Sequence, residues 1–80
     1  MSRCEHISQG SEIQTLDGFL TVEGWNGRLV DVTEWLLDRD GGEHEGRELR
    51  MTLNEIAAVM KEVDGRNHRV LWDEELDEED

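Results

Sequence analysis

The sequence predicts a small α+β domain, in which a β-hairpin and a short mixed sheet pack with two helices and precede a disordered acidic tail. The chain has 80 residues, of which 35% are hydrophobic, so it can build one modest core. Two segments, at 31–34 and 52–55, have the residue spacing of a helix capping box. Seven of the 21 acidic residues lie in the last eight positions. We therefore expect a flexible arm over residues 1–10, a single α+β domain over 11–72 and an acidic tail over 73–80.

The first predicted elements are the strands of a hairpin. Residues 12–16 and 19–23 carry alternating apolar side chains, and the Asp-Gly dipeptide at 17–18 between them favours a tight turn. The Asn-Gly dipeptide at 26–27 predicts a second turn of the same kind. Residues 28–32 can then form a third strand.

A change of pattern after this strand predicts a short helix. Asp31 has capping-box spacing to Glu34, and the apolar residues that follow stop before a pair of glycines. We expect this helix over residues 32–40. The Gly- and Glu-rich residues 41–46 predict a loop, and residues 47–51 a short strand.

The second predicted helix, over residues 52–64, has the strongest local signal in the chain. Thr52 can cap its first turn while the Glu55 side chain returns a hydrogen bond to the cap. Apolar residues then recur on one face of a 3.6-residue period: Leu53, Ile56, Met60 and Val63. Gly65 ends this helix, and residues 70–72 predict the last strand.

No group of residues has the spacing of a catalytic, metal or cofactor site. Cys4 and His6 form a cysteine–histidine pair, whereas a structural zinc site takes four ligands in paired clusters. The single cysteine also excludes an internal disulfide framework. Residues 64–75 have the length of a calcium loop, but arginine and histidine stand where ligands and glycine are needed. We expect a protein that is not an enzyme and binds no metal or cofactor.

The net charge of −13 decides which partners are expected. Direct nucleic-acid binding needs a basic face, which this chain lacks. No apolar run approaches the roughly 20 residues that cross a bilayer, and no secretory leader opens the chain, so we expect a cytoplasmic protein away from membranes.

Carboxylates can instead replace phosphates opposite lysine and arginine. The sequence thus predicts an inhibitor that mimics nucleic-acid charge and blocks a basic site on a nucleic-acid-binding protein or complex. Phage inhibitors of restriction and CRISPR systems are similar in size and charge.

The predicted binding surface follows carboxylate density. It takes in the short helix with its loop, the strand residue Glu48 and the start of the tail, with Trp72 beside the tail as a candidate anchor. Because the chain has one Phe and no Tyr, a core position for Trp72 stays an open alternative. The predicted residues are Glu34, Asp38, Asp40, Glu43, Glu45, Glu48, Trp72, Asp73, Glu74 and Glu75.

Two alternatives stay open. Residues 11–37 have the sequence SEIQTLDGFLTVEGWNGRLVDVTEWLL and resemble the amino-terminal segment of the DsrC/TusE sulfur-relay proteins. In that family a hairpin with a D-G-[FY]-L element precedes a Trp. Residues 17–20 match this element, and Trp25 matches the Trp that follows it. The alternative function is a small regulatory or accessory interaction module that docks through its apolar face or Trp side chains, and the resemblance implies its most specific form, a degenerate relative of the sulfur-relay proteins. That family carries sulfur on a cysteine near its carboxyl terminus, where this chain has acids, and Cys4 matches no such position. The acidity can also reflect a salt-adapted host, and the oligomeric state is not predicted.

Overall fold

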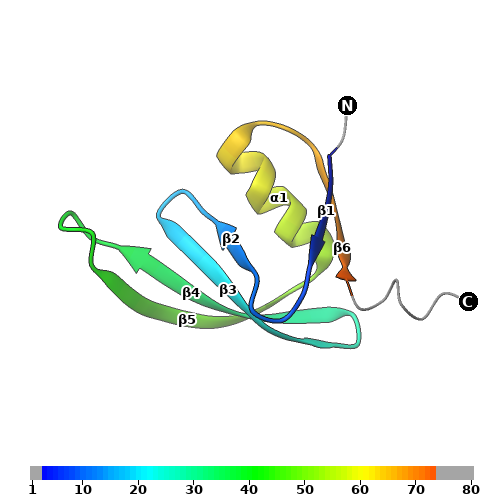
Figure 1. The fold of residues 1–80 in the computed structure, drawn as a ribbon, viewed down its shortest axis with the longest axis horizontal. Helices are drawn as coiled ribbons and strands as arrows, with labels where there is room; N and C mark the ends of the chain where they lie inside the picture. The colour runs from blue at the N-terminus through cyan, green and yellow to red at the C-terminus, as the bar shows by residue number, and fades with distance from the viewer. Residues whose placement is uncertain (1–2, 74–80) are drawn as a thin grey trace, which may run out of the picture.

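The computed structural model describes residues 3–73, whose backbone forms six strands and one helix (Figure 1). The domain is therefore mostly β, and the predicted α+β class with two helices is wrong. Residues 74–80, most of the predicted tail, lie outside the described residues. The elements are β1 (Arg3–Ile7), β2 (Glu12–Gln14), β3 (Gly18–Asn26), β4 (Leu29–Leu37), β5 (Glu43–Met51), α1 (Leu53–Asp64) and β6 (His68–Trp72).

Strands β2 to β5 form a four-stranded antiparallel meander in chain order. The β3–β4 hairpin closes through Gly27 and Arg28, one residue later than expected, and Gly27 has a φ of +66°. A two-residue turn of this kind needs glycine at its first position. The start of β3 depends on Gly18, because a Cβ there would clash with the backbone carbonyl oxygen of Trp35 on the neighbouring strand β4.

A helix predicted over residues 32–40 is wrong, because residues 29–37 form β4. Val30 and Val32 are buried in the core, while Asp31 lies between them on the other face, so the apolar period is two rather than 3.6. Pairing with β3 on one side and β5 on the other outweighs the local capping pattern. The predicted loop over residues 41–46 is wrong from residue 43 onward, where the exposed edge strand β5 begins.

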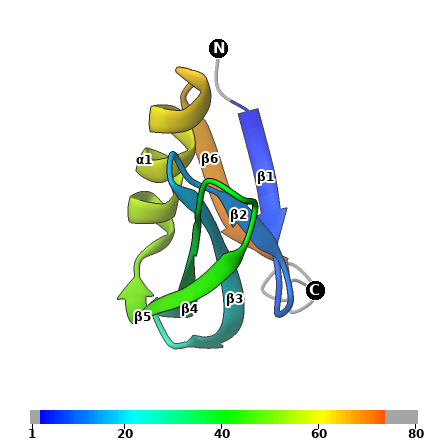
Figure 2. The ribbon, with the colours of Figure 1, turned by 90° about the vertical axis from the view of Figure 1, so that its left-hand side faces the viewer.

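Residues 3–7, expected within the flexible arm, form β1 and pair in parallel with β6. The register joins Arg3 to His68 at one end and Ile7 to Trp72 at the other. In the turned view of Figure 2, β6 lies between α1 and β1. The first and last described strands are therefore neighbours.

Helix α1 confirms the second predicted helix. The Thr52 hydroxyl accepts the Glu55 backbone N–H at 3.1 Å, and the Glu55 carboxylate accepts the Thr52 N–H at 2.8 Å. Gly65, at a φ of +75°, ends the helix and donates its N–H to the Lys61 carbonyl. Among the described residues, no helix has the length and apolar character to span a membrane.

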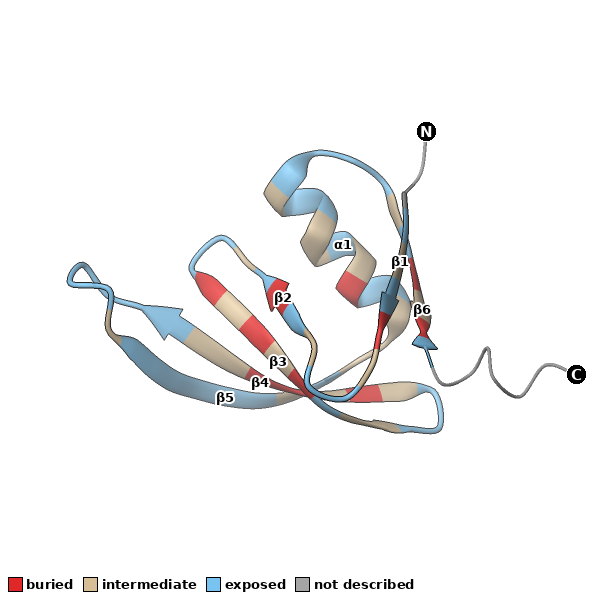
Figure 3. Cartoon of the chain, viewed as in Figure 1, coloured by how far each residue is buried: buried red, intermediate tan, exposed pale blue. Residues whose placement is uncertain are grey.

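One core lies between α1, the meander and β6, and Figure 3 shows its buried positions along these elements. Trp72 is only 2% exposed and stacks on Trp25 of β3, with ring centroids 5.4 Å apart. The expectation that Trp72 is an exposed partner anchor is therefore wrong, because its ring is part of the core. The buried hydrophobic residues are Ile7, Ile13, Leu20, Val22, Val30, Val32, Ile56, Val70 and Trp72.

Candidate functional site

The face of the meander that points away from α1 carries aromatic, hydroxyl and acidic side chains, which we call the outer face. Three rows cross strands β3, β4 and β5 on it, because side chains directly opposite in an antiparallel pair share a face. Phe19, Trp35 and Glu45 form one row, Thr21, Thr33 and Glu48 the next, and Gly24, Asp31 and Arg50 the third. The outer face comprises Phe19, Thr21, Glu23, Asp31, Thr33, Trp35, Glu45, Glu48 and Arg50.

Hydrogen bonds fix several of these side chains. The Trp35 indole N–H donates to the Thr21 hydroxyl at 3.0 Å. The hydroxyls of Thr21 and Thr33 both donate to Oε2 of Glu23, at 3.1 and 3.2 Å. Glu23 is the extra residue of a β-bulge in β3, where such a bulge redirects a side chain. Phe19 stacks on Trp35 with ring planes 10° apart, so the indole is held from the β3 side.

A shallow pocket of about 650 Å³ lies on the outer face. Asp31 and Arg50 form an ion pair of 3.1 Å at its rim. Among residues 3–73, Glu45 and Glu48 have no ion-pair partner and are exposed. The pocket is lined by Glu23, Asp31, Val32, Thr33, Trp35, Glu45, Glu48, Leu49 and Arg50. Its chemistry suits a cationic group, because carboxylate oxygens outnumber the one base.

The structure separates the residues predicted for the binding surface. Glu45 and Glu48 lie on the outer face, and strand alternation puts Glu43 on the same side. Glu34 lies on the opposite face, where its side chain is 24% exposed and pairs with Arg47 at 3.4 Å. The predicted helix would have grouped these carboxylates, whereas the strand divides them.

Asp38 and Asp40 belong to the turn between β4 and β5. The Asp38 carboxylate lies 2.7 Å from Nε2 of His44 and accepts the backbone N–H groups of Gly42 and Asp40 at 2.7 and 2.9 Å. The hydrogen bond from His44, followed by that from Gly42, lowers the pKa of Asp38. Asp38 thus holds the turn in shape, and Asp40 is exposed beside it.

Of the remaining predicted residues, Asp73 directly follows β6. Asp73 is exposed, with its carboxylate 3.7 Å from Nδ1 of His6. Glu74 and Glu75 lie outside the described residues. Sequence reasoning missed the outer-face residues Phe19, Thr21, Glu23, Asp31, Thr33, Trp35 and Arg50. The signal that could have found them is the alternation of residues 30–35, once read as a strand.

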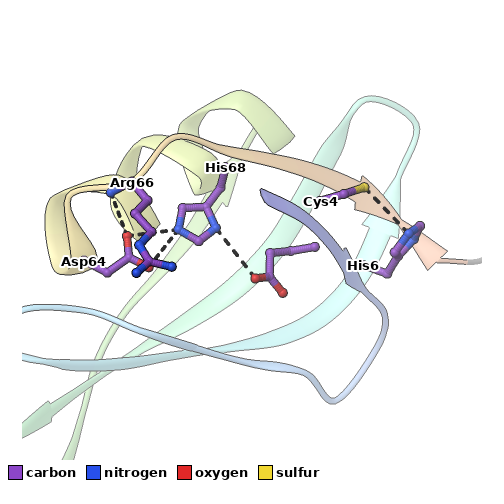
Figure 4. Close-up of polar contacts among 6 residues, drawn as sticks. Cys4, His6, Asp64, Arg66 and His68 are labelled. Atoms are coloured by element: carbon purple, nitrogen blue, oxygen red, sulfur yellow. Dashed lines mark hydrogen bonds and ion pairs between the residues drawn. The ribbon is translucent and has the colours of Figure 1, made fainter. Parts of the chain in front are cut away.

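A second polar cluster surrounds His68, whose side chain is only 4% exposed (Figure 4). Its Nε2 lies 2.9 and 3.0 Å from the two carboxylate oxygens of Asp64, and its Nδ1 is 3.7 Å from Oε1 of Glu5. The backbone N–H of Arg66 and the His68 ring lower the pKa of Asp64. This cluster ties the end of α1 to β6 and β1.

The cysteine lies on β1 beside the second cluster. Cys4 is exposed, with Sγ 3.8 Å from Nε2 of His6. Within the part of the chain that the structure describes, no group of three or more His, Cys, Asp or Glu side chains is arranged to hold a metal ion.

An apolar patch lies at the far end of the meander. Leu16, Leu36 and Leu37 are 70%, 39% and 49% exposed and line one pocket of about 600 Å³. Exposed apolar residues that line one pocket mark a candidate docking site. We call these three residues the leucine patch.

The chain matches no family model, and neither a curated protein nor a solved structure is significantly similar to it. The resemblance of residues 11–37 to sulfur-relay proteins stays a prediction. These residues contain β2, β3 and β4.

Proposed function

We propose that the protein is a non-enzymatic binding protein whose outer face occupies a basic site on a nucleic-acid-binding protein or complex in the cytoplasm. By occupying that site it keeps nucleic acid out. The observation that supports this proposal most is the group of carboxylates from Glu23, Glu45 and Glu48 around one pocket, in a chain of net charge −13.

The carboxylates of the outer face would act on a basic partner through electrostatic attraction. Carboxylates spaced on a surface can meet lysine and arginine side chains that otherwise contact phosphates. A strong negative field also speeds the encounter with a positively charged partner, and salt screens that field.

Rigidity supports the proposal further. Glu23 is held by two hydroxyl donors, and Glu45 and Glu48 extend from a strand rather than a loop. Groups that are already positioned lose less conformational entropy on binding than mobile ones.

The test is competition with nucleic acid. Partners are captured at low salt, and each purified partner is bound to a fluorescent DNA or RNA duplex. Added protein should displace the duplex, with a potency that falls steeply as salt rises. Glu45→Gln/Glu48→Gln should weaken displacement about fivefold, since two exposed ion pairs at about 0.5 kcal/mol each contribute about 1 kcal/mol together.

The matched control is Glu12→Gln/Glu62→Gln, which removes the same charge from exposed positions on β2 and α1. It should change the displacement by less than about twofold. Absence of displacement by the unmodified protein, or equal weakening by both double variants, would contradict the proposal.

The leucine patch favours a second candidate function, a regulatory or accessory module that docks through apolar contacts. That function predicts a partner retained at high salt, which screens charges but strengthens apolar contacts. Leu16→Ser/Leu37→Ser should release such a partner, and Glu45→Gln/Glu48→Gln should not.

A further inference from the structure

We infer that the outer-face pocket binds an arginine side chain of the basic partner, with the guanidinium held between the Trp35 indole and the carboxylates of Glu45 and Glu48. The inference rests on the proposed function for the presence of a basic partner. It adds the residue type that the site selects.

The indole has one side available for such a contact. Phe19 and Thr21, both on β3, hold the ring by stacking and by a hydrogen bond to its N–H. The pocket is lined by Trp35 but by neither of these two residues. The indole surface facing the pocket is therefore not the one that Phe19 covers, and the carboxylates of Glu45 and Glu48 line the same pocket. Cations are attracted to such an aromatic face, and arginine also stacks on it.

A bulge brings two carboxylates to this indole. Glu45 and Glu48 are three residues apart, and in an unbroken strand side chains at that spacing point to opposite faces. Here Glu45 pairs with Trp35 and Glu48 with Thr33, because the register of β5 shifts between these pairs. The extra residue puts both glutamates on the outer face beside the indole.

The protein's own arginine at this pocket is already engaged. Arg50 pairs with Asp31 at 3.1 Å, on the rim. Glu45 and Glu48 lie farther along β5, with no ion-pair partner among residues 3–73. The carboxylates of Glu45 and Glu48 are thus available to accept hydrogen bonds from an incoming cation, because no side chain among residues 3–73 pairs with them.

Arginine fits this geometry better than lysine. The planar guanidinium can stack on the indole while its N–H groups donate to carboxylates at its edge. The lysine ammonium is a strongly hydrated point charge that can satisfy the carboxylates but cannot stack. A surface that attracts positive charge alone would bind arginine and lysine equally well. A preference for arginine therefore indicates a specific pocket rather than a general negative field.

The experiment compares oligoarginine and oligolysine peptides of equal length, fluorescently labelled, by anisotropy at physiological ionic strength. The unmodified protein should bind oligoarginine about five- to tenfold more tightly. Glu45→Gln and Trp35→Leu should each reduce this ratio to near one. Trp35→Phe, which keeps an aromatic face, should retain part of the preference, and urea unfolding checks that each variant is folded.

Glu62→Gln is the matched control, because it removes the same charge from an exposed position on α1. It should lower both affinities by the same small factor and leave the ratio unchanged. Equal affinity for both peptides, or an equal ratio in Glu45→Gln and Glu62→Gln, would overturn the inference. In that case the proposed function can still be correct, because the protein can displace nucleic acid without a preference for arginine. An arginine preference without displacement supports the pocket and contradicts the nucleic-acid-binding partner.

Discussion

Replacing Trp72 by alanine should destabilise the whole domain. The side chain is 2% exposed and is the largest of the fully buried set. It stacks on Trp25 with ring planes 18° apart, and in the β1–β6 pair it lies opposite Ile7. The substitution therefore removes contacts that join β3, β6 and the core.

The expected loss is large compared with total stability. Truncation of a buried tryptophan to alanine costs about 3–5 kcal/mol, because it removes apolar burial and leaves a cavity. A domain of 80 residues has about 4–12 kcal/mol of unfolding free energy in total. The alanine variant should thus lose at least a quarter of its stability, and most of it if the domain lies at the lower end of this range.

Urea unfolding followed by far-UV circular dichroism measures this loss. Trp72→Phe, which keeps an aromatic ring in the core, should cost roughly 1–2 kcal/mol. Trp35→Ala serves as the surface comparison and should cost less than Trp72→Ala, because the indole is half-buried on the outer face. If Trp72→Ala kept the unfolding midpoint and lost partner binding instead, the core role would be refuted and Trp72 would be an anchor after all.

Three further changes have defined outcomes. Gly18→Ala should cost more than about 2 kcal/mol in urea unfolding, because its Cβ meets the Trp35 carbonyl, whereas Gly24→Ala meets nothing within 4 Å and should be close to neutral. Thr52→Ala should lower the urea midpoint by an amount equivalent to about 1 kcal/mol with an unchanged slope, since it removes the helix cap; a changed slope would contradict a purely local effect. The pKa of Asp64 is held below its ordinary value of 3.8, so its stabilising effect is complete above that pH and is lost as pH falls through the lowered pKa. The stability difference between the unmodified protein and Asp64→Asn should therefore shrink on acidification below about pH 3.8, and a difference that grows there would contradict this assignment.

Helix α1 could be predicted from the sequence because its determinants are local. Thr52, Glu55 and Gly65 supply both caps within the segment itself. The same kind of local signal was misleading at Asp31 and Glu34, where pairing with strands on both sides decides the structure. A capping pattern without a 3.6-residue apolar face is thus weak evidence for a helix.

The strand predicted over residues 47–51 is confirmed as the second half of β5, whereas β1 and the first residues of β5 could not be predicted, for a different reason. Pairing of β1 with β6 is a contact between opposite ends of the chain, which no local pattern encodes. Residues 43–48 of β5 carry mainly charged, exposed side chains, as is typical of a protected sheet edge, and so lack the apolar alternation that marks a strand.

Part of the candidate site followed from composition alone. Glu45 and Glu48 were predicted by carboxylate density, and both lie on the outer face. The capping pattern at residues 31–34 predicts a helix that contains Trp35, so the sequence does not reveal the row that Trp35 forms with Phe19 and Glu45. A bulge depends on the register between strands, which the spacing of residues in one strand does not reveal.

The pairing of β1 with β6 also has a consequence for protein synthesis. In the described part of the chain, β1 pairs with β6 alone. Because synthesis runs from the amino terminus, residues 3–7 are made before residues 68–72. The hairpins of the meander and α1 can form from nearby contacts in the meantime, whereas β1 must wait for closure of a loop of about 60 residues. A nascent chain thus carries β1 unpaired, with Ile7 uncovered, until β6 emerges.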